Sequence, residues 1–366
     1  MATHLFQGLQ RRFLICLLAV VVAGHPANRA AAQQAEPPLM AAGGDTFPLA
    51  QQTPSTGQDS STFNGAFGGV PLNSTGPEQV SLASYTSTLD EPLVPLAGSS
   101  AATPRPPGSK PGVFQQVMFT STWMPGGGAN GLGITDLWLQ STFGFPLPTP
   151  DSPLLLTPSF EAQFLDGPTS PDLPPRLYDA ALQFRYLRKF TPEFGIDLAV
   201  SPGMHGDFEP NSGREFRIPS RAIGAYDWDP ELQIVFGVAY LDREDINWLP
   251  VGGVIWTPND CTRVEAIVPR PRFSRRFCYD GITEDWWYVA GEFGGGSYGI
   301  QRANGTPDVA TTSDYRILLG LEQKTCDGIN GRVEIGYVFG RKVEYLSGTP
   351  TFNPDPTFLL RVGVWY

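Results

Sequence analysis

His205 is the residue of this sequence whose side chain is best suited to acid–base catalysis at neutral pH. It lies in the stretch PGMHGDFE, two residues before Asp207, and an imidazole beside a carboxylate can act as a general base. A hydrolase or acyltransferase that uses a serine needs such a base next to its nucleophile. Nothing in the sequence places a serine opposite His205. We therefore favour an exposed loop histidine, and we predict that the chain is not an enzyme and needs no cofactor.

Two further groups of charged residues were weighed as binding sites. Asp242, Glu244, Asp245 and Asn247 offer oxygen ligands for Ca²⁺, but the turn glycine and distal glutamate of an EF-hand are absent, so a solvated turn is favoured. A run of closely spaced arginines is formed by Arg270, Arg272, Arg275 and Arg276. It could line a constriction that selects anions. In a chain with a net charge of -11, neutralisation by acids on facing strands is the favoured reading.

Two glycine-rich stretches resemble phosphate-binding loops only superficially. Neither Gly126–Gly133 nor Gly291–Gly299 ends in the Lys-Ser or Lys-Thr pair of a P-loop. We interpret the first as a hairpin loop and the second as strand glycines that let a sheet curve.

The elements that must position these residues are strands, because hydrophobic side chains recur with a period of two. Tyr178, Ala180, Leu182, Phe184 and Tyr186 share one face of such a stretch, and Asp179, Gln183 and Arg185 share the other. The same alternation returns in 194–201, 315–322 and 333–340. A soluble sandwich also alternates. Tryptophans near the expected strand ends favour a membrane barrel with aromatic girdles instead.

The polar faces of these strands predict a wet interior lined by charges of both signs. The candidate lumen charges are Asp179, Arg185, Arg217, Arg221, Arg272, Glu322 and Glu334.

The C-terminal residues alternate to the last position. Phe358, Leu360, Val362, Val364 and Tyr366 share the apolar face, and a terminal aromatic at the end of such a face resembles the signal by which outer-membrane barrels are recognised for assembly. The usual last residue is Phe, so Tyr366 is a departure. A C-terminal edge strand is the alternative.

The predicted fold is an all-β, antiparallel up-and-down transmembrane β-barrel. We identify thirteen strand-like stretches, and single-chain bacterial barrels take even numbers. The weakest stretch is 250–256, where Gly252 and Gly253 interrupt the pattern. We therefore predict about 12 strands, with 10 or 14 as alternatives, in a barrel spanning residues 113–366.

The N-terminal third has a different composition. Arg11 and Arg12, the apolar run Phe13–Gly24 and then Ala30–Ala32 follow the order of a secretory signal peptide, predicted over residues 1–32. Residues 33–112 are rich in Pro, Gly, Ser and Thr and are predicted to be a disordered periplasmic tether. Export to the bacterial outer membrane is expected, with membrane lipid and the barrel-assembly machinery as partners. The net charge of -11 argues against nucleic acid as a partner.

Several phrases together resemble an uncharacterised family of outer-membrane β-barrel proteins common in planctomycetes. They include LPPRLYDAALQFRYL (Leu173–Leu187), LPVGGVIWTPND (Leu249–Asp260), GEFGGGSYGI (Gly291–Ile300) and GRVEIGYVFGRKVEY (Gly331–Tyr345). The resemblance spans roughly Val113–Tyr366 and implies a barrel. It implies no catalytic residue.

The polar inner face and the absence of a catalytic constellation favour a passive pore for small solutes. A closed structural or surface-display barrel is the alternative, and a lipid-modifying enzyme comes third.

A disulfide between Cys278 and Cys326 is predicted from the expected strands. If 262–277 is one strand, Cys261 and Cys278 lie at its opposite ends, roughly 50 Å apart at about 3.3 Å per residue. Cys278 and Cys326 would then share a rim, one strand apart, in an oxidising compartment. Free thiols at all three positions are the alternative.

Overall fold

The computed structural model describes residues 112–128, 130–149, 152–167, 171–325 and 328–366. The predicted signal peptide and all of the predicted tether except its last residue lie outside them. This described part of the chain is built from strands and contains no helix. A helix that is long and apolar enough to span a membrane is accordingly not found in it.

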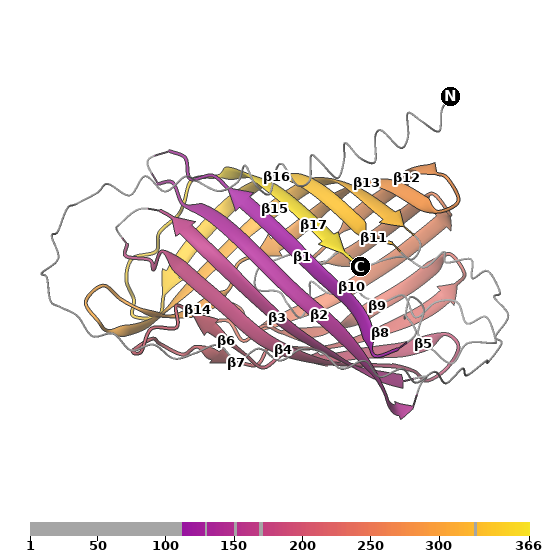
Figure 1. The fold of residues 1–366 in the computed structure, drawn as a ribbon, viewed down its shortest axis with the longest axis horizontal. Helices are drawn as coiled ribbons and strands as arrows, with labels where there is room; N and C mark the ends of the chain where they lie inside the picture. The colour runs from indigo at the N-terminus through magenta and orange to yellow at the C-terminus, as the bar shows by residue number, and fades with distance from the viewer. Residues whose placement is uncertain (1–111, 129, 150–151, 168–170, 326–327) are drawn as a thin grey trace, which may run out of the picture. The chain divides into compact units, whose positions relative to one another are not determined.

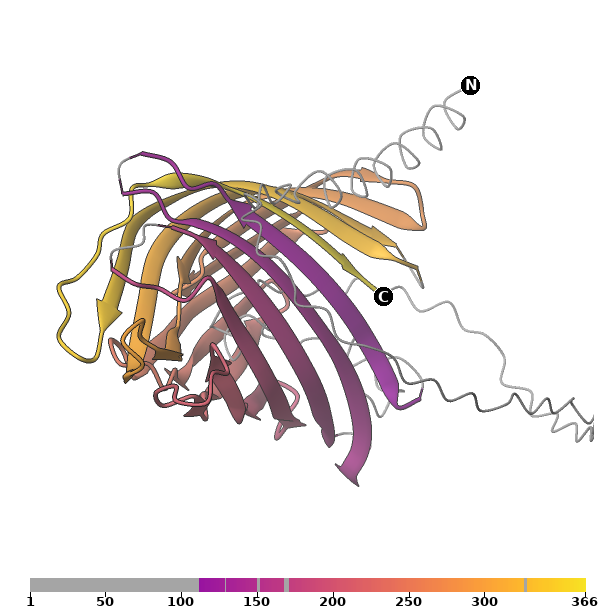
Figure 2. The same cartoon turned by 60° about the vertical axis from the view of Figure 1, so that its left-hand side comes forward.

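All strands belong to one sheet, which closes on itself (Figures 1 and 2). The strands are β1 (Phe114–Met124), β2 (Gly133–Thr149), β3 (Ser152–Asp166), β4 (Arg176–Lys189), β5 (Phe194–Val200), β6 (Gly203–Gly206), β7 (Phe216–Arg217), β8 (Ser220–Asp229), β9 (Leu232–Tyr240), β10 (Trp248–Asn259), β11 (Thr262–Val268), β12 (Arg272–Tyr279), β13 (Thr283–Gly294), β14 (Ser297–Gln301), β15 (Pro307–Thr325), β16 (Asn330–Tyr345) and β17 (Thr357–Trp365).

Three successive pairs of strands act as single strands of the wall. Both β5 and β6 pair with β4. On their other side, β8 pairs with β5 and β7 pairs with β6. Both β13 and β14 pair with β15. Counting each pair once gives a barrel of 14 antiparallel strands. The seam is the antiparallel pairing of β1 with β17, from Met118 opposite Trp365 to Trp123 opposite Leu360. A closed barrel leaves no unpaired edge along this seam.

The prediction of about 12 strands is wrong, and both errors lie between residues 248 and 279. The segment around 250–256 is a full strand, β10. Its glycines do not interrupt it, because a Cβ on Gly253 would overlap the carbonyl oxygen of Ala266 on β11 and glycine permits that close approach. The segment 262–277, predicted as one strand, is the hairpin of β11 and β12, with Thr262 opposite Arg275. Pro269 and Pro271 lie at its tip, and proline cannot donate to a strand ladder.

Side chains alternate between the two faces of the wall as the sequence predicts. On β4, Asp179, Gln183 and Arg185 are buried, whereas Leu182 and Phe184 on the opposite face are exposed. The pattern recurs on β15, where Ile317, Leu319 and Leu321 are exposed. Because a closed barrel has only an inside and an outside, the buried polar set faces the interior.

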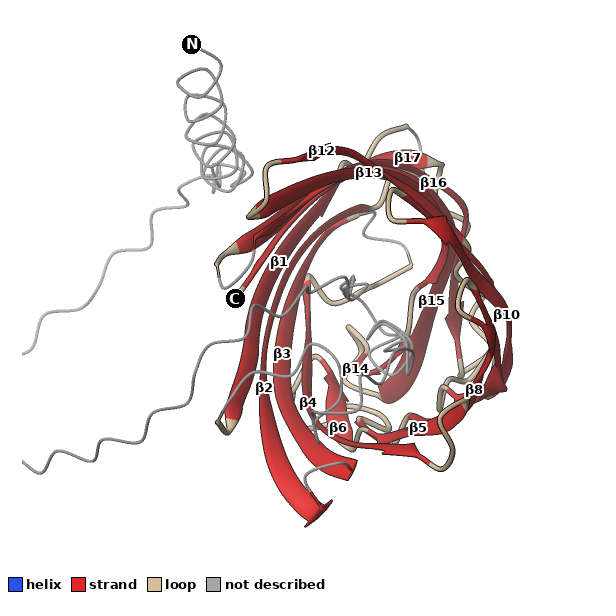
Figure 3. Ribbon diagram, turned by 90° about the vertical axis from the view of Figure 1, so that its right-hand side faces the viewer, coloured by secondary structure: helices blue, strands red, loops and turns tan. Residues whose placement is uncertain are grey.

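The two ends of the barrel are built differently. We call the end where β1 begins and β17 ends the near end, and the opposite end the far end. At the far end, Gly206 of β6 and Gly299 of β14 form a parallel β-bridge. Five wall strands separate these two segments along the sheet, so the bridge joins parts that are not neighbours in the wall. Looking along the barrel, β14 lies inside the outline of the other strands (Figure 3). The backbone amide of Asp207 donates to Gly299 O at 3.1 Å, so the loop after β6 also joins this bridge.

Candidate functional site

The predicted lumen charges all lie on the inner face of the wall. Asp179, Arg185, Arg217, Arg221, Glu322 and Glu334 are buried, and Arg272 keeps 11% of its side chain exposed. The structure does not gather them in one place. It divides six of the seven, with partners that the sequence analysis did not name, among three groups. The seventh, Arg217, donates from Nη1 to the carbonyl oxygen of Asp242 at 2.6 Å.

The first group joins β4, β5 and β8 around one carboxylate. Arg185 and Arg221 both face Ala199 in the register, and Asp197 lies two residues away on the same face. Arg185 donates to Asp197 from Nε at 3.0 Å and from Nη2 at 2.8 Å, and Arg221 Nη2 donates at 3.2 Å. One carboxylate therefore holds two buried guanidinium groups, in the fork geometry that suits arginine.

The second group spans β12 to β17 and contains buried charges of both signs. Arg361 Nη1 donates to Glu334 at 3.1 Å and to Glu292 at 3.4 Å. Tyr288 Oη donates to the other oxygen of Glu334 at 2.6 Å. Arg272 pairs with Glu322 and lies 3.8 Å above the ring of Tyr288. This group is an interlocked set of ion pairs rather than a row of free charges.

The third group is an acidic row on β2, β3 and β4 that ends at a histidine. Glu161 lies opposite Asp179, and Asp179 lies opposite His205. Asp136 lies opposite Gln163, two residues along β3 from Glu161. His205 is 1% exposed, and its Nδ1 lies 2.8 Å from Asp179. The interpretation of His205 as an exposed loop residue is therefore wrong, because its loop segment forms the strand β6.

The arginine run at 270–276 does not form a ring of unpaired charges. Arg270, Arg272 and Arg276 contact Glu292, Glu322 and Glu284, respectively. Arg275 is exposed on the outer face of β12. This arrangement agrees with the favoured interpretation, in which acidic side chains on facing strands neutralise the arginines. It does not agree with a constriction in which these residues select anions.

The acidic loop at 242–247 acts as a brace at the far end. Arg243 pairs with Asp245 at 2.7 Å and donates to the carbonyl oxygens of Gly295 and Thr312, each at 3.0 Å. Asp242 accepts from the amide of Ile218 at 2.7 Å. Within the described residues, no group of three or more His, Cys, Asp or Glu side chains is arranged to hold a metal ion.

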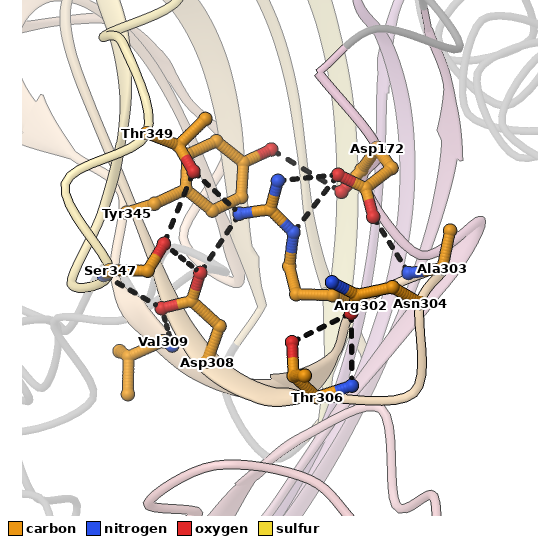
Figure 4. Close-up of polar contacts among 10 residues, drawn as sticks. All are labelled: Asp172, Arg302, Ala303, Asn304, Thr306, Asp308, Val309, Tyr345, Ser347 and Thr349. Atoms are coloured by element: carbon orange, nitrogen blue, oxygen red, sulfur yellow. Dashed lines mark hydrogen bonds and ion pairs between the residues drawn. The ribbon is translucent and has the colours of Figure 1, made fainter.

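Arg302 organises the loops of the far end (Figure 4). Its Nε donates to Asp172 at 2.9 Å, and its Nη1 donates to Asp308 at 2.8 Å and to Thr349 at 3.0 Å. The amide of Ala303 also donates to Asp172, at 2.7 Å. The side-chain hydrogen bond from Arg302 holds the pKa of Asp172 below its ordinary value. Three loops that are distant in sequence are thus tied to one guanidinium group.

The cysteines do not lie as the single long strand implied. Because 262–277 is a hairpin, Cys261 and Cys278 lie at the same near end, and Arg276 N donates to Cys261 O at 2.8 Å. Both thiols are free in the structure. Cys326 lies outside the described residues, so its bond to Cys278 stays a prediction that mass spectrometry of unreduced peptides would test.

The candidate lumen charges named from the sequence do not include several further charged residues of the interior. They are Asp136, Glu161, Asp197, Glu292, Arg316, Arg332 and Arg361. The signal was present, since each occupies a polar position in an alternating stretch. Arg332, for example, shares a face with the predicted Glu334 in GRVEIGY.

Comparison with known proteins adds likeness of form. No protein-family model matches the chain, and no curated protein matches it. Among solved structures, it is similar to the KdgM porin at 11% identity and a TM-score of 0.33, covering 69% of this chain and 98% of that one. It is also similar to the NanC porin at 10% identity and a TM-score of 0.33, covering 67% and 98%. An outer membrane channel from Pseudomonas putida F1 is similar at 12% identity and a TM-score of 0.35, covering 70% and 96%. These values are too low to assign a function, and the planctomycete resemblance stays an expectation.

Proposed function

We propose that the chain is an exported outer-membrane β-barrel that acts as a passive, narrow pore for small polar solutes. The observation that carries the proposal is the pairing of an apolar outside with a charged inside in one closed wall. Phe358, Ile335 and Ile317 are 70%, 57% and 55% exposed on the outer face. Such a surface is suited to contact with lipid. Only closed barrels and helices can span a lipid bilayer.

The two ends support an orientation across the membrane. The turns at the near end are short, such as 190–193 and 230–231, whereas far-end connections such as 207–215 and 346–356 are longer. Outer-membrane barrels combine short periplasmic turns with longer external loops. We therefore place the near end in the periplasm and the far end outside.

Conductance of the refolded chain in planar bilayers tests the pore. We expect discrete single-channel currents in KCl, with some preference for cations contributed by the acidic row. Replacing Asp136, Glu161 and Asp179 together by Asn, Gln and Asn should shift the reversal potential in a salt gradient toward anions. The matched control is Glu231→Gln, which removes an exposed carboxylate from a near-end turn. A folded barrel that passes neither ions nor sugars would contradict the proposal.

A closed structural barrel is the second candidate, and one observation favours it. Arg185, Arg332 and Arg361 are 0% exposed, so the interior is tightly filled around them. In this case the refolded barrel would carry no ionic current in the bilayer, and liposomes containing it would not swell in solutions of small sugars. We propose no enzymatic role. Unchanged lipid hydrolysis by His205→Ala would agree with that.

Assembly through β17 is part of the same proposal. This strand forms the seam by pairing with both β16 and β1, and Tyr366 exchanges backbone hydrogen bonds with Val117 at 3.0 and 3.1 Å. Deleting Tyr366 should lower the amount of barrel in the outer membrane more than it lowers export across the inner membrane. Fractionation followed by comparison of boiled and unboiled samples measures this. Normal levels of heat-modifiable, truncated protein would contradict the assembly role.

A further inference from the structure

The inner face of the wall is not polar throughout. On β8, β9, β10 and β11 it carries apolar and small residues, which we call the apolar trough. The members of the trough are Ile223, Ala225, Val235, Gly237, Ala239, Val251, Gly253, Ile255 and Ile267. One row of the register runs from Ala225 through Val235 and Gly253 to Ile267. The next row, from Ile223 through Gly237 to Val251, also contains no charged side chain.

The trough is buried although it lies on the lumen side of the wall. Val235 is 1% exposed, and Ile255 and Ile267 are 4% and 7% exposed. A single sheet does not cover its own apolar face, so a second layer must lie against it. Side chains alone fill a barrel of about eight strands, and the interior widens as strands are added. In a barrel of 14 strands we therefore do not expect the opposite wall to supply that layer.

Only the far-end part of the trough has an apolar cover among the described residues. Leu241 and Ile246, from the loop between β9 and β10, pack in the cluster that contains the trough. No other described hydrophobic residue from outside the four strands belongs to this cluster. Val235 and Ile255 lie closer to the near-end turns than to this loop. The near-end part of the trough therefore needs an apolar cover that these loop residues do not supply.

The chain that precedes β1 is long enough to supply the cover. Residues 33–111 lie outside the described residues and lead to β1, which begins at Phe114 at the near end. The 15 residues 97–111 span roughly 50 Å when extended, at about 3.3 Å per residue, whereas the 12 residues of β10 span roughly 40 Å. A segment that ends at Leu96 can therefore enter the lumen at the near end and reach the trough.

The composition of Leu89–Leu96 suits an apolar wall. This stretch, LDEPLVPL, has large apolar side chains at 89, 93, 94 and 96. Pro92 and Pro95 favour an extended backbone, and each lacks an N–H group that would need a partner beside an apolar surface. The stretch Phe63–Leu72 is also apolar, but it contains three glycines. Ordering it costs more conformational entropy, because glycine loses the most freedom on folding.

The charges of the same segment complement the edge of the trough. Asp90 and Glu91 lie next to its apolar residues. Arg221 lies opposite Ala239 of the trough and shares the carboxylate of Asp197 with Arg185. Two guanidinium groups on one carboxylate leave an excess of positive charge there, which favours an acidic segment nearby.

We propose that Leu89–Leu96 lies in the lumen against the apolar trough, as a plug that the chain itself supplies. This part of the predicted tether is then inside the barrel rather than in the periplasm. The inference goes beyond the pore proposal and does not depend on it, because a barrel without transport can hold the same segment. In a conducting barrel, the plug narrows the passage beside β8–β11.

Thiol labelling of the trough tests the plug. The refolded mature chain carries Val235→Cys in a background whose native cysteines are replaced by serine. A water-soluble maleimide should label this thiol slowly while the barrel is folded. Replacing the four large apolar residues of Leu89–Leu96 by serine should accelerate labelling about tenfold or more, because a weakened plug leaves the trough more often. Unboiled mobility verifies that each variant is folded.

The matched control replaces the four large apolar residues of Phe63–Leu72, at 63, 67, 70 and 72, by serine. It removes the same number of apolar side chains from the same predicted tether. Val235→Cys should stay as protected in this control as in the chain with an unchanged tether. Equal acceleration by the two replacements would overturn the assignment of the plug to Leu89–Leu96.

Cross-linking gives a second measurement, which decides the question if the serine replacement fails to fold. In the folded chain, a short bis-maleimide should join Leu93→Cys to Val235→Cys. It should not join Leu93→Cys to Phe236→Cys, because Phe236 is the next residue of β9 and is exposed on the outer face. Cross-links of equal yield to both positions, or to neither, would contradict the plug.

The outcomes separate the plug from the pore. Rapid labelling of Val235→Cys with an unchanged tether, or equally slow labelling after the serine replacement in Leu89–Leu96, overturns the plug. A protected trough in a barrel that carries no current supports the plug and refutes only the pore. A conducting barrel with an unprotected trough refutes only the plug.

Discussion

Arg185 on β4 and Arg332 on β16 are both completely buried on the inner face of the barrel, yet their surroundings differ. Arg185 makes two hydrogen bonds to Asp197, at 2.8 and 3.0 Å. Arg332 makes none to any residue that the structure describes, and a carboxylate oxygen of Glu334 lies 3.9 Å from its Nε. Burial alone therefore does not tell whether an interior charge holds the wall together. Hydrogen-bond saturation separates an arginine that stabilises the fold from one that is kept at a cost in stability.

The largest expected effect comes from removing the carboxylate that accepts two hydrogen bonds from Arg185. Asp197→Asn leaves Arg185 and Arg221 without a counter-charge, and breaking a buried ion pair typically costs about 3–5 kcal/mol. The urea midpoint, followed by the loss of heat-modifiable mobility, should fall accordingly. Asp260→Asn, in an exposed near-end turn, serves as the control and should leave the midpoint unchanged. Equal midpoints for the two variants would remove the distinction drawn here.

The opposite sign is expected when the unsaturated arginine is removed. Arg332→Met replaces a buried charge that makes no hydrogen bond within the described residues by an apolar side chain of similar length, which removes the cost of burying an unbonded guanidinium group. The variant should unfold at the same or a higher urea concentration than the unchanged chain. The matched variant Arg185→Met should unfold at a lower one. Destabilisation of similar size in both would show that Arg332 is as structural as Arg185.

A third arginine, Arg302, gives the smallest effect because its pair with Asp172 is partly exposed. Side-chain exposures of 15% and 30% place this pair near the surface, where ion pairs contribute about 1 kcal/mol or less. The pKa of Asp172 is lowered, so its contribution is complete above its ordinary value of 3.8 and is lost as the pH falls through the lowered value. The amide of Ala303 donates to Asp172. Its protection factor, which is corrected for the intrinsic pH dependence of hydrogen exchange, should therefore decrease as the pH is lowered through this range.

Asp172→Asn provides the reference for that measurement. Without a titrating carboxylate, the protection of Ala303 should show no acid-linked change beyond the intrinsic pH dependence of exchange. Glu209→Gln removes a carboxylate from a different far-end loop and should behave like the unchanged chain. An identical pH profile for all three proteins would mean that Arg302 does not hold this loop.

The strands were predictable because alternation is a local property of the sequence. On β4 and β15, the predicted faces agree with the observed order of buried polar and exposed apolar positions. The exceptions depend on local chemistry that the pattern hides. Gly253 interrupts the pattern in the sequence but permits a close approach between strands, and Pro269 and Pro271 mark a hairpin tip that the alternation alone does not reveal.

The interior partners were not predictable in the same way, because they depend on register between strands. Asp179 and His205 meet only because β4 pairs with β6 in one alignment, and a shift of one residue would turn either side chain outward. The alternation marks the charged positions of the inner face, including Arg332 and others that the sequence analysis did not name. It could not say which of them would find a partner.

The bridge between Gly206 and Gly299 has a consequence for the order in which the barrel folds. Hairpins between sequence neighbours close short loops, whereas this contact joins segments separated by five intervening wall strands. Forming a long-range contact costs more loop-closure entropy, and this cost arises before the contact contributes any stabilisation. We expect the far-end bridge to form after the hairpins between β7 and β13, so the chain passes through a species whose wall is largely paired while its outer rim is still open.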